Sequence, residues 1–161
     1  MVSKIKTLIC CIFLFLSLTE CGGKVEELII IVPENYTGYI LIIYDQDQGI
    51  NKEYLNKSRV YRIPSSGILL TKFSNNPGWS TFPEFYRGSI AQENKIPFIP
   101  ESEKLSEDKV SAFGGAAGFQ SRDFSGKKGI RFIQFYIGNQ SQIRKYISDL
   151  DHLNIVELVD K

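Results

Sequence analysis

The 161-residue chain is poor in the residues that most often carry chemistry, with three Cys, one His, one Met and one Trp. So few Cys and His leave no margin for a Cys/His zinc site, and we expect neither a metal nor a cofactor. Lys and Arg together number 19, against 18 Asp and Glu. A general nucleic-acid surface needs surplus cations to displace phosphate counterions, so we expect no nucleic-acid partner.

The first twenty residues have the pattern of an export signal. Lys4 and Lys6 precede an apolar run over residues 8–18, LICCIFLFLSL. The run is too short for a transmembrane helix, which needs about 20 residues. A buried core helix is the alternative, but two lysines directly before a run with no polar face fit it poorly. The pattern predicts a signal peptide over residues 1–20.

The end of this signal resembles the lipobox of bacterial lipoproteins. Leu18, Thr19 and Cys21 match that family's motif, whereas Glu20 stands where the family prefers Gly, Ala or Ser. The resemblance implies that Cys21 is lipidated and that residues 21–25 are a short tether. It also implies a membrane partner, reached through the lipid, on the extracytoplasmic face of a bacterial membrane. An uncleaved signal anchor and plain secretion remain alternatives.

Residues 26–161 are expected to form a single β-rich domain. Its apolar runs are rich in β-branched residues and predict strands at 26–32, 38–45, 58–63, 68–73 and 129–138. The turn at 64–67 (PSSG) predicts a hairpin between the third and fourth runs. Gly114 and Gly115 indicate a bulge or close packing in a weaker strand over 110–120.

One helix is expected after the strand at 129–138. Asn139 and Gln142 have the spacing of a capping box, and Ile143, Ile147 and Leu150 form one apolar stripe. The composition of residues 154–159 predicts a closing strand. The fold class predicted is mainly β (α+β): an antiparallel β-sandwich-like domain with one C-terminal helix and a closing strand.

Three segments carry a family resemblance: VPENYTGYILIIYD (32–45), YRIPSSGILLT (61–71) and FIQFYIGNQSQIRKY (132–146). They resemble an uncharacterised family of small bacterial lipoprotein-like domains. That resemblance implies no assigned activity and no catalytic residues. The opening strands also look like transthyretin-like modules, which are β-sandwiches, but fold analogy supplies no function.

Aromatic residues are concentrated between positions 79 and 86. The candidate ligand-binding residues are Trp79, Phe82, Phe85, Tyr86 and Arg87. Exposed aromatic loops bind sugars, peptides or proteins by flat apolar contact, so we expect a protein or glycan partner. The alternative is that these side chains close one end of the sandwich as core.

No complete catalytic set is present in the sequence. His152 near the helix end lacks an adjacent nucleophile, and the acidic residues between 101 and 108 lie among lysines in a Pro-containing stretch. We therefore expect a membrane-anchored binding or structural module rather than an enzyme. Two alternatives remain: an envelope hydrolase using Asp and Glu carboxylates, and an accessory or immunity-type protein with one cognate partner.

Overall fold

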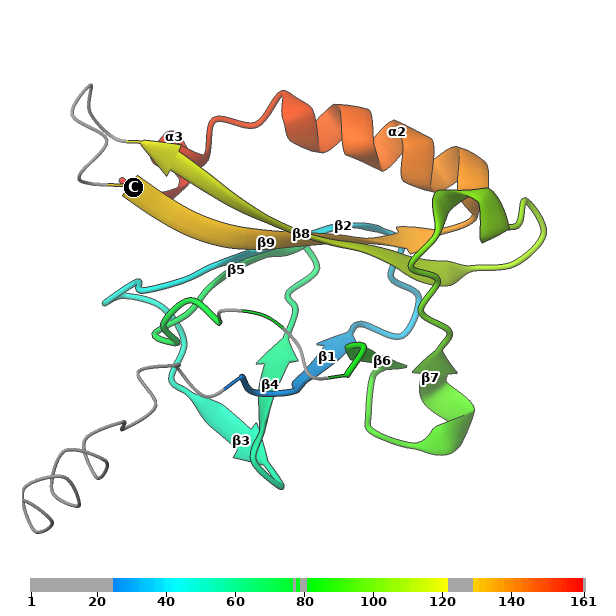
Figure 1. Ribbon diagram of the computed structural model, residues 1–161, viewed down its shortest axis with the longest axis horizontal. Helices are drawn as coiled ribbons and strands as arrows, with labels where there is room; N and C mark the ends of the chain where they lie inside the picture. The colour runs from blue at the N-terminus through cyan, green and yellow to red at the C-terminus, as the bar shows by residue number, and fades with distance from the viewer. Residues whose placement is uncertain (1–24, 77, 79–80, 122–128, 161) are drawn as a thin grey trace, which may run out of the picture.

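The computed structural model describes residues 25–160 apart from 77, 79–80 and 122–128, and it places two β-sheets face to face (Figure 1). The first sheet has the order β3 (Glu53–Leu55), β4 (Ser58–Arg62), β1 (Leu28–Val32), β6 (Glu84–Arg87), β7 (Lys95–Ile96). The second sheet has the order β5 (Ile68–Leu70), β2 (Gly38–Ile43), β9 (Gly129–Gly138), β8 (Ser111–Ser121). The signal peptide, Cys21 and Trp79 lie outside the described residues.

Two strands organise the sheets because they are apolar on both faces. Every residue of β1 is buried, and β1 pairs in parallel with β4 on one side and β6 on the other. β2 pairs in parallel with β5 and antiparallel with β9. Strands that are buried on both faces read as continuous apolar runs, which is why these two could be recognised from the sequence.

The main core fills the space between the two sheets. Its aromatic members make edge and stacked contacts, including Phe85 with Phe135 at 5.2 Å and Tyr61 with Phe73 at 5.3 Å between ring centroids. Such pairs stabilise by about 1 kcal/mol each beyond the area that they bury. The two sheets are therefore joined by side-chain packing, as expected for a sandwich.

A second apolar cluster lies on the opposite face of the second sheet, where α2 (Gln140–Asp151) and α3 (Ile155–Val159) pack. Figure 1 shows α2 lying over this sheet, on the side away from β1. Ile143 and Leu150 of α2 are buried in the cluster, as the stripe predicted. The capping box is confirmed, because Asn139 Oδ1 accepts from Gln142 N at 2.9 Å and Gln142 Oε1 accepts from Asn139 N at 3.0 Å.

The predicted α+β sandwich-like fold is confirmed, but the expected antiparallel strand direction is wrong for three pairs, since β1 pairs in parallel with β4 and β6, and β2 with β5. Two elements also need correction. The predicted closing strand is the helix α3, whose first turn is capped by Asn154 Oδ1 accepting from Val156 N at 3.2 Å. The hairpin predicted over 58–73 is wrong, because β4 joins the first sheet and β5 the second. The bulge in β8 is confirmed by a register shift between Gly114 and Ala116 against β9.

Candidate functional site

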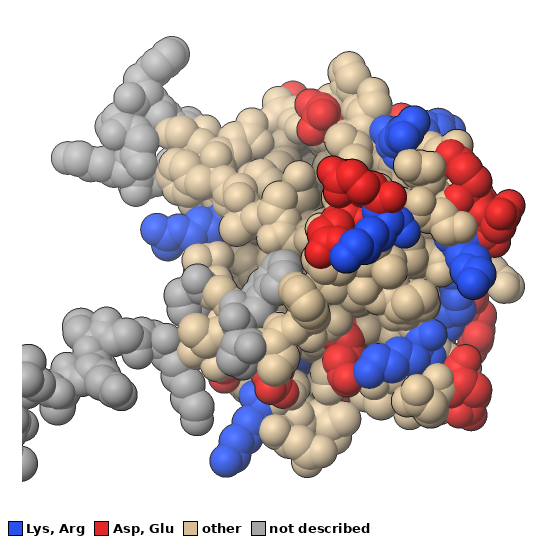
Figure 2. All heavy atoms as spheres, turned by 45° about the vertical axis from the view of Figure 1, so that its right-hand side comes forward, with Lys and Arg blue, Asp and Glu red and all other residues tan. Residues whose placement is uncertain are grey.

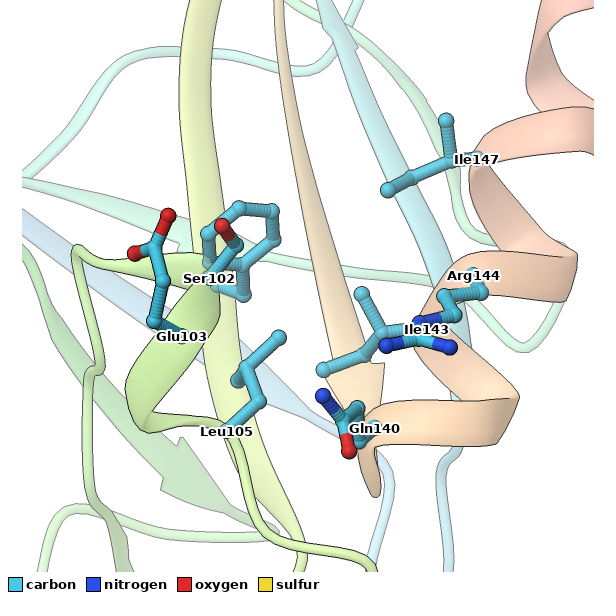
Figure 3. Close-up of a pocket in the computed structure, with 8 residues that line it drawn as sticks. Ser102, Glu103, Leu105, Gln140, Ile143, Arg144 and Ile147 are labelled. Carbon is cyan, nitrogen blue, oxygen red and sulfur yellow. The ribbon is translucent and has the colours of Figure 1, made fainter.

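A groove opens where α2, the outer face of β8 and the 3-10 turn η2 (Ser102–Lys104) meet (Figure 3). Its volume is about 280 Å³. The residues that line it are Ser102, Glu103, Leu105, Phe113, Gln140, Ile143, Arg144 and Ile147. An apolar concavity with a few polar groups at its rim is the usual form of a small-molecule or peptide-side-chain site.

The wall of the groove is apolar because three separate segments of the chain contribute apolar side chains to it. Ile143 and Ile147 are one turn apart on α2, so they share the face that meets the sheet. Phe113 comes from β8 and stacks on Tyr136 with 6.4 Å between ring centroids. Leu105 follows η2 and closes the third side.

The polar rim is a short hydrogen-bonded series at the start of α2. With its amide oriented to satisfy both neighbours, Gln140 donates to Glu107 Oε1 and accepts from Arg144 Nη2, each at 3.1 Å. Glu107 also accepts from Ser141 N at 3.2 Å and Ser141 Oγ at 2.7 Å. A carboxylate at a helix N-terminus is favourable for the helix dipole. Arg144 is thus held beside the apolar wall, where a guanidinium can receive a carboxylate or another anionic group.

Tyr136, whose ring stacks with that of Phe113, carries a neutral hydroxyl at neutral pH. Burial, together with the nearby carboxylate of Asp151, raises the pKa of Tyr136 to about 12. Tyr136 therefore behaves as part of the apolar floor that supports Phe113, and it offers no proton donor or acceptor of ordinary pKa for catalysis.

Charges on the molecular surface are mixed. Figure 2 shows basic and acidic side chains beside one another over the face that it draws. Arg62 lies 2.9 Å from Glu53, and Lys95 lies 2.6 Å from Glu84. On this face there is no segregated field of one sign that would steer a highly charged ligand.

The aromatic residues singled out in the sequence are divided between surface and core. Phe82 is 61% exposed and lies 5.5 Å from Phe98, between ring centroids. Phe85 is fully buried and stacks on Phe98 at 5.6 Å, so for this residue the core alternative is the observed one. Tyr86 is also buried, on the outer face of the first sheet, with its hydroxyl donating to Glu84 Oε2 at 2.9 Å.

Arg87 has a structural role in the fold. Its Nη1 donates to the main-chain oxygens of Glu34 at 2.9 Å and Tyr36 at 3.1 Å. These contacts fasten the end of β6 to the turn between β1 and β2. The five residues do not form one exposed aromatic surface, because two of the four aromatic members are buried.

Other polar residues considered from the sequence are dispersed. His152 Nδ1 lies 2.6 Å from Ser148 O at the end of α2. Glu101 pairs with Lys104, whereas Glu107 binds the first turn of α2. Among the described residues, no three His, Cys, Asp or Glu side chains are grouped to hold a metal ion. Within those same ranges, no helix is both long and apolar enough to cross a bilayer.

Comparison with known proteins places the chain in a family. The model of the family of unknown function DUF6843 matches residues 24–143, and the chain belongs to that family. No curated protein matches the chain. A crystal structure of a Bacillus anthracis protein named "Putative Lipoprotein" is similar, with a TM-score of 0.50 and 14% identity. The similarity covers 71% of each chain and shows a shared fold.

The groove was missed in the sequence because its parts are far apart along the chain. Ile143 and Ile147 were recognised only as a packing stripe, and Arg144 lies between them. Leu105 offered the one local signal, since it is the only large aliphatic residue between Pro100 and Lys109. An isolated apolar residue in a charged segment marks a point where a surface excursion packs against the domain.

Proposed function

We propose that this protein is a lipid-anchored envelope lipoprotein whose β-sandwich acts as a binding module, with the groove between α2 and β8 as its binding site. The main support for the lipid anchor is the position of Cys21, three residues after the end of an apolar run and within a lipobox-like motif. The similar Bacillus anthracis structure bears a lipoprotein name, which supports the same reading. Two or more acyl chains would hold the domain firmly, since each buried CH₂ contributes about 0.8 kcal/mol.

The groove supports binding rather than catalysis as the activity of the domain. Its wall is formed by Leu105, Phe113, Ile143 and Ile147, and Arg144 stands at its rim. No described side chain in it pairs a nucleophile with a base, as covalent catalysis requires. The chemistry fits a small apolar group that ends in a carboxylate or another anion.

Metabolic labelling with a fatty-acid analogue tests the anchor. The wild-type chain should take up label and fractionate with membranes, whereas the Cys21→Ser variant should do neither. Cys10→Ser is the matched control, because Cys10 lies inside the predicted signal and its loss should leave labelling unchanged. Equal labelling of wild type and Cys21→Ser would refute the anchor.

Titration with 1-anilinonaphthalene-8-sulfonate, an apolar ring system with one anionic group, tests the groove. Arg144→Gln should weaken binding of this probe several-fold because it removes the cation at the rim. Lys145→Gln is the matched control: the same charge is lost from the next residue, which is exposed and does not line the groove. Equal effects of the two substitutions would show that the probe responds to net charge and not to this site.

A further inference from the structure

Among the described residues, the long strand β8 has a strand partner on only one side. It is the last strand in the order of the second sheet and has 11 residues, whereas the other edge strands β3, β5 and β7 have three, three and two. Near its start, the free side is covered by a short connection: Ile99 N donates to Ala112 O, and Ala112 N donates to Pro97 O, both at 2.8 Å. Beyond Ala112, no described segment forms a ladder with that side.

The main-chain N–H and C=O groups of Ala117 and Phe119 point outward from this edge, away from β9. Phe119 stands opposite Arg131 in the β8–β9 register, and Arg131 O accepts from Tyr44 N at 3.0 Å on the β2 side. Main-chain groups of an antiparallel strand point alternately to its two neighbours. Because Arg131 bonds toward β2, Phe119 turns its N–H and C=O away from β9, and Ala117, two residues earlier, does the same.

Apart from the bulge between Gly114 and Ala116, this edge lacks the devices that keep an exposed strand from pairing. Residues 111–121 (SAFGGAAGFQS) contain no charged residue and no Pro. Charges, prolines or a very short strand are the usual means of protecting an edge. The side chains between the bulge and Phe119 are only Ala116, Ala117 and the hydrogen of Gly118, so a second backbone can approach closely.

Phe119 is itself half exposed on this strand. Half of its surface is accessible, and its ring lies over Gly129, where an added Cβ would stand 2.2 Å from the ring. Its side chain is on the same face as that of Ala117, because the two residues are separated by one. The edge therefore presents one large and one small apolar side chain beside two outward-facing main-chain units.

We infer that β8 pairs antiparallel with β8 of a second copy of this chain, about a two-fold axis close to Gly118. In that register Ala117 of each copy faces Phe119 of the other, and each such pair exchanges two main-chain hydrogen bonds. The large ring meets the small methyl group, so side-chain volume is complementary across the axis. The two second sheets become one continuous sheet, and exposed Phe119 is buried. This inference is independent of the lipid anchor and of the groove.

Photo-crosslinking of the full chain, extracted from bacterial envelopes in mild detergent, tests the pairing directly. Benzoylphenylalanine placed at Phe119 should give a covalent dimer of twice the chain mass, with the crosslink mapped to β8 of the other copy. The same amino acid placed at Tyr54 is the control, because Tyr54 has the same exposed fraction, 50%, but lies on β3 in the first sheet. A crosslink to a different protein, or no crosslink at Phe119, would overturn the inference.

A second measurement distinguishes pairing of the β8 edges from nonspecific association of the chains. Ala117→Pro removes the outward N–H without removing a bond to β9, and should weaken dimerisation at least tenfold in light scattering of the same detergent extract. Ala117→Ser keeps the N–H and should dimerise like the wild type. Thermal unfolding should show both variants folded. A wild-type chain that is monomeric at all concentrations, or a Pro variant that dimerises normally, contradicts the pairing.

Discussion

Arg59 Nε lies 2.5 Å from Glu26 Oε2, and this ion pair fastens the start of β4 to the residues that precede β1. The Arg59 side chain is only 6% exposed. Its Nη1 donates to Ser74 O at 2.5 Å, and its guanidinium lies 4.8 Å from the ring centroid of Phe73. One buried side chain thus joins three segments at the end of the sandwich where β1, β4 and β6 begin.

Arg59→Ala should lower the free energy of unfolding by about 3 kcal/mol, because it leaves Glu26 without its cation and Ser74 O without its donor. Urea denaturation followed by circular dichroism measures the loss. Arg62→Ala is the matched control on the same strand, since Arg62 and Glu53 form an exposed pair expected to contribute less than about 1 kcal/mol. Similar losses for the two variants would mean that burial does not set the strength of these pairs.

Gly67→Ala should destabilise the turn that precedes β5. Gly67 has φ +78°, and a Cβ there would stand 2.3 Å from Tyr39 O, a main-chain atom. The left-handed backbone alone costs a non-glycine residue about 1–2 kcal/mol, and the contact adds to it. Gly78→Ala has open space around the added methyl and should be nearly neutral. Thermal unfolding of both variants decides, and an unchanged midpoint for Gly67→Ala would show that the turn can rearrange.

Asn139→Ala should cost about 1 kcal/mol, because it removes the side chain that caps the N-terminus of α2. The same change should weaken probe binding in the groove, since Gln140 and Arg144 lie in the first two turns of the helix that Asn139 caps. Denaturant unfolding and the probe titration measure the two effects. A variant of normal stability would show that Glu107 alone satisfies the first turn of the helix.

Stability should fall steeply in alkaline solution. Burial raises the pKa of Tyr36 to about 12, from an ordinary value of 10.0 that the unfolded chain retains. Below that ordinary value the phenol is neutral in both states and its contribution to stability is complete. As the pH rises toward 12, the unfolded state loses its proton first, so stability declines. Thermal midpoints measured across this range should fall less steeply for Tyr36→Phe; an identical slope would contradict the assignment.

The strands that the sequence predicted well are those rich in β-branched and aromatic residues. β1 and β2 are buried on both faces, and β9 carries Ile, Phe and Tyr along most of its length, so composition identified all three. The helix α2 was predicted from its cap and stripe, which are local signals. The fold class therefore followed from short-range patterns.

The errors arose where a distant neighbour decides the structure. Residues 58–73 look like a hairpin locally, yet β4 pairs with β1 and β5 with β2. Residues 154–159 have strand-like composition, but Asn154 caps a helical turn and Ile155 is buried against the second sheet. The groove could not be predicted for the same reason, since its walls come from three separate elements that only the fold brings together.

The pairing of β2 with β9 joins two parts of the chain that are far apart in the sequence. Gly38 stands opposite Ile137, so the second sheet remains incomplete until nearly the whole chain has been synthesised. Folding is slow when a long loop must close first, because the entropy of that loop is lost before the contacts that it allows can stabilise the fold. The export proposed above requires a chain that is still extended when it enters a translocation channel, and late closure of the β2–β9 pair would keep it in that state.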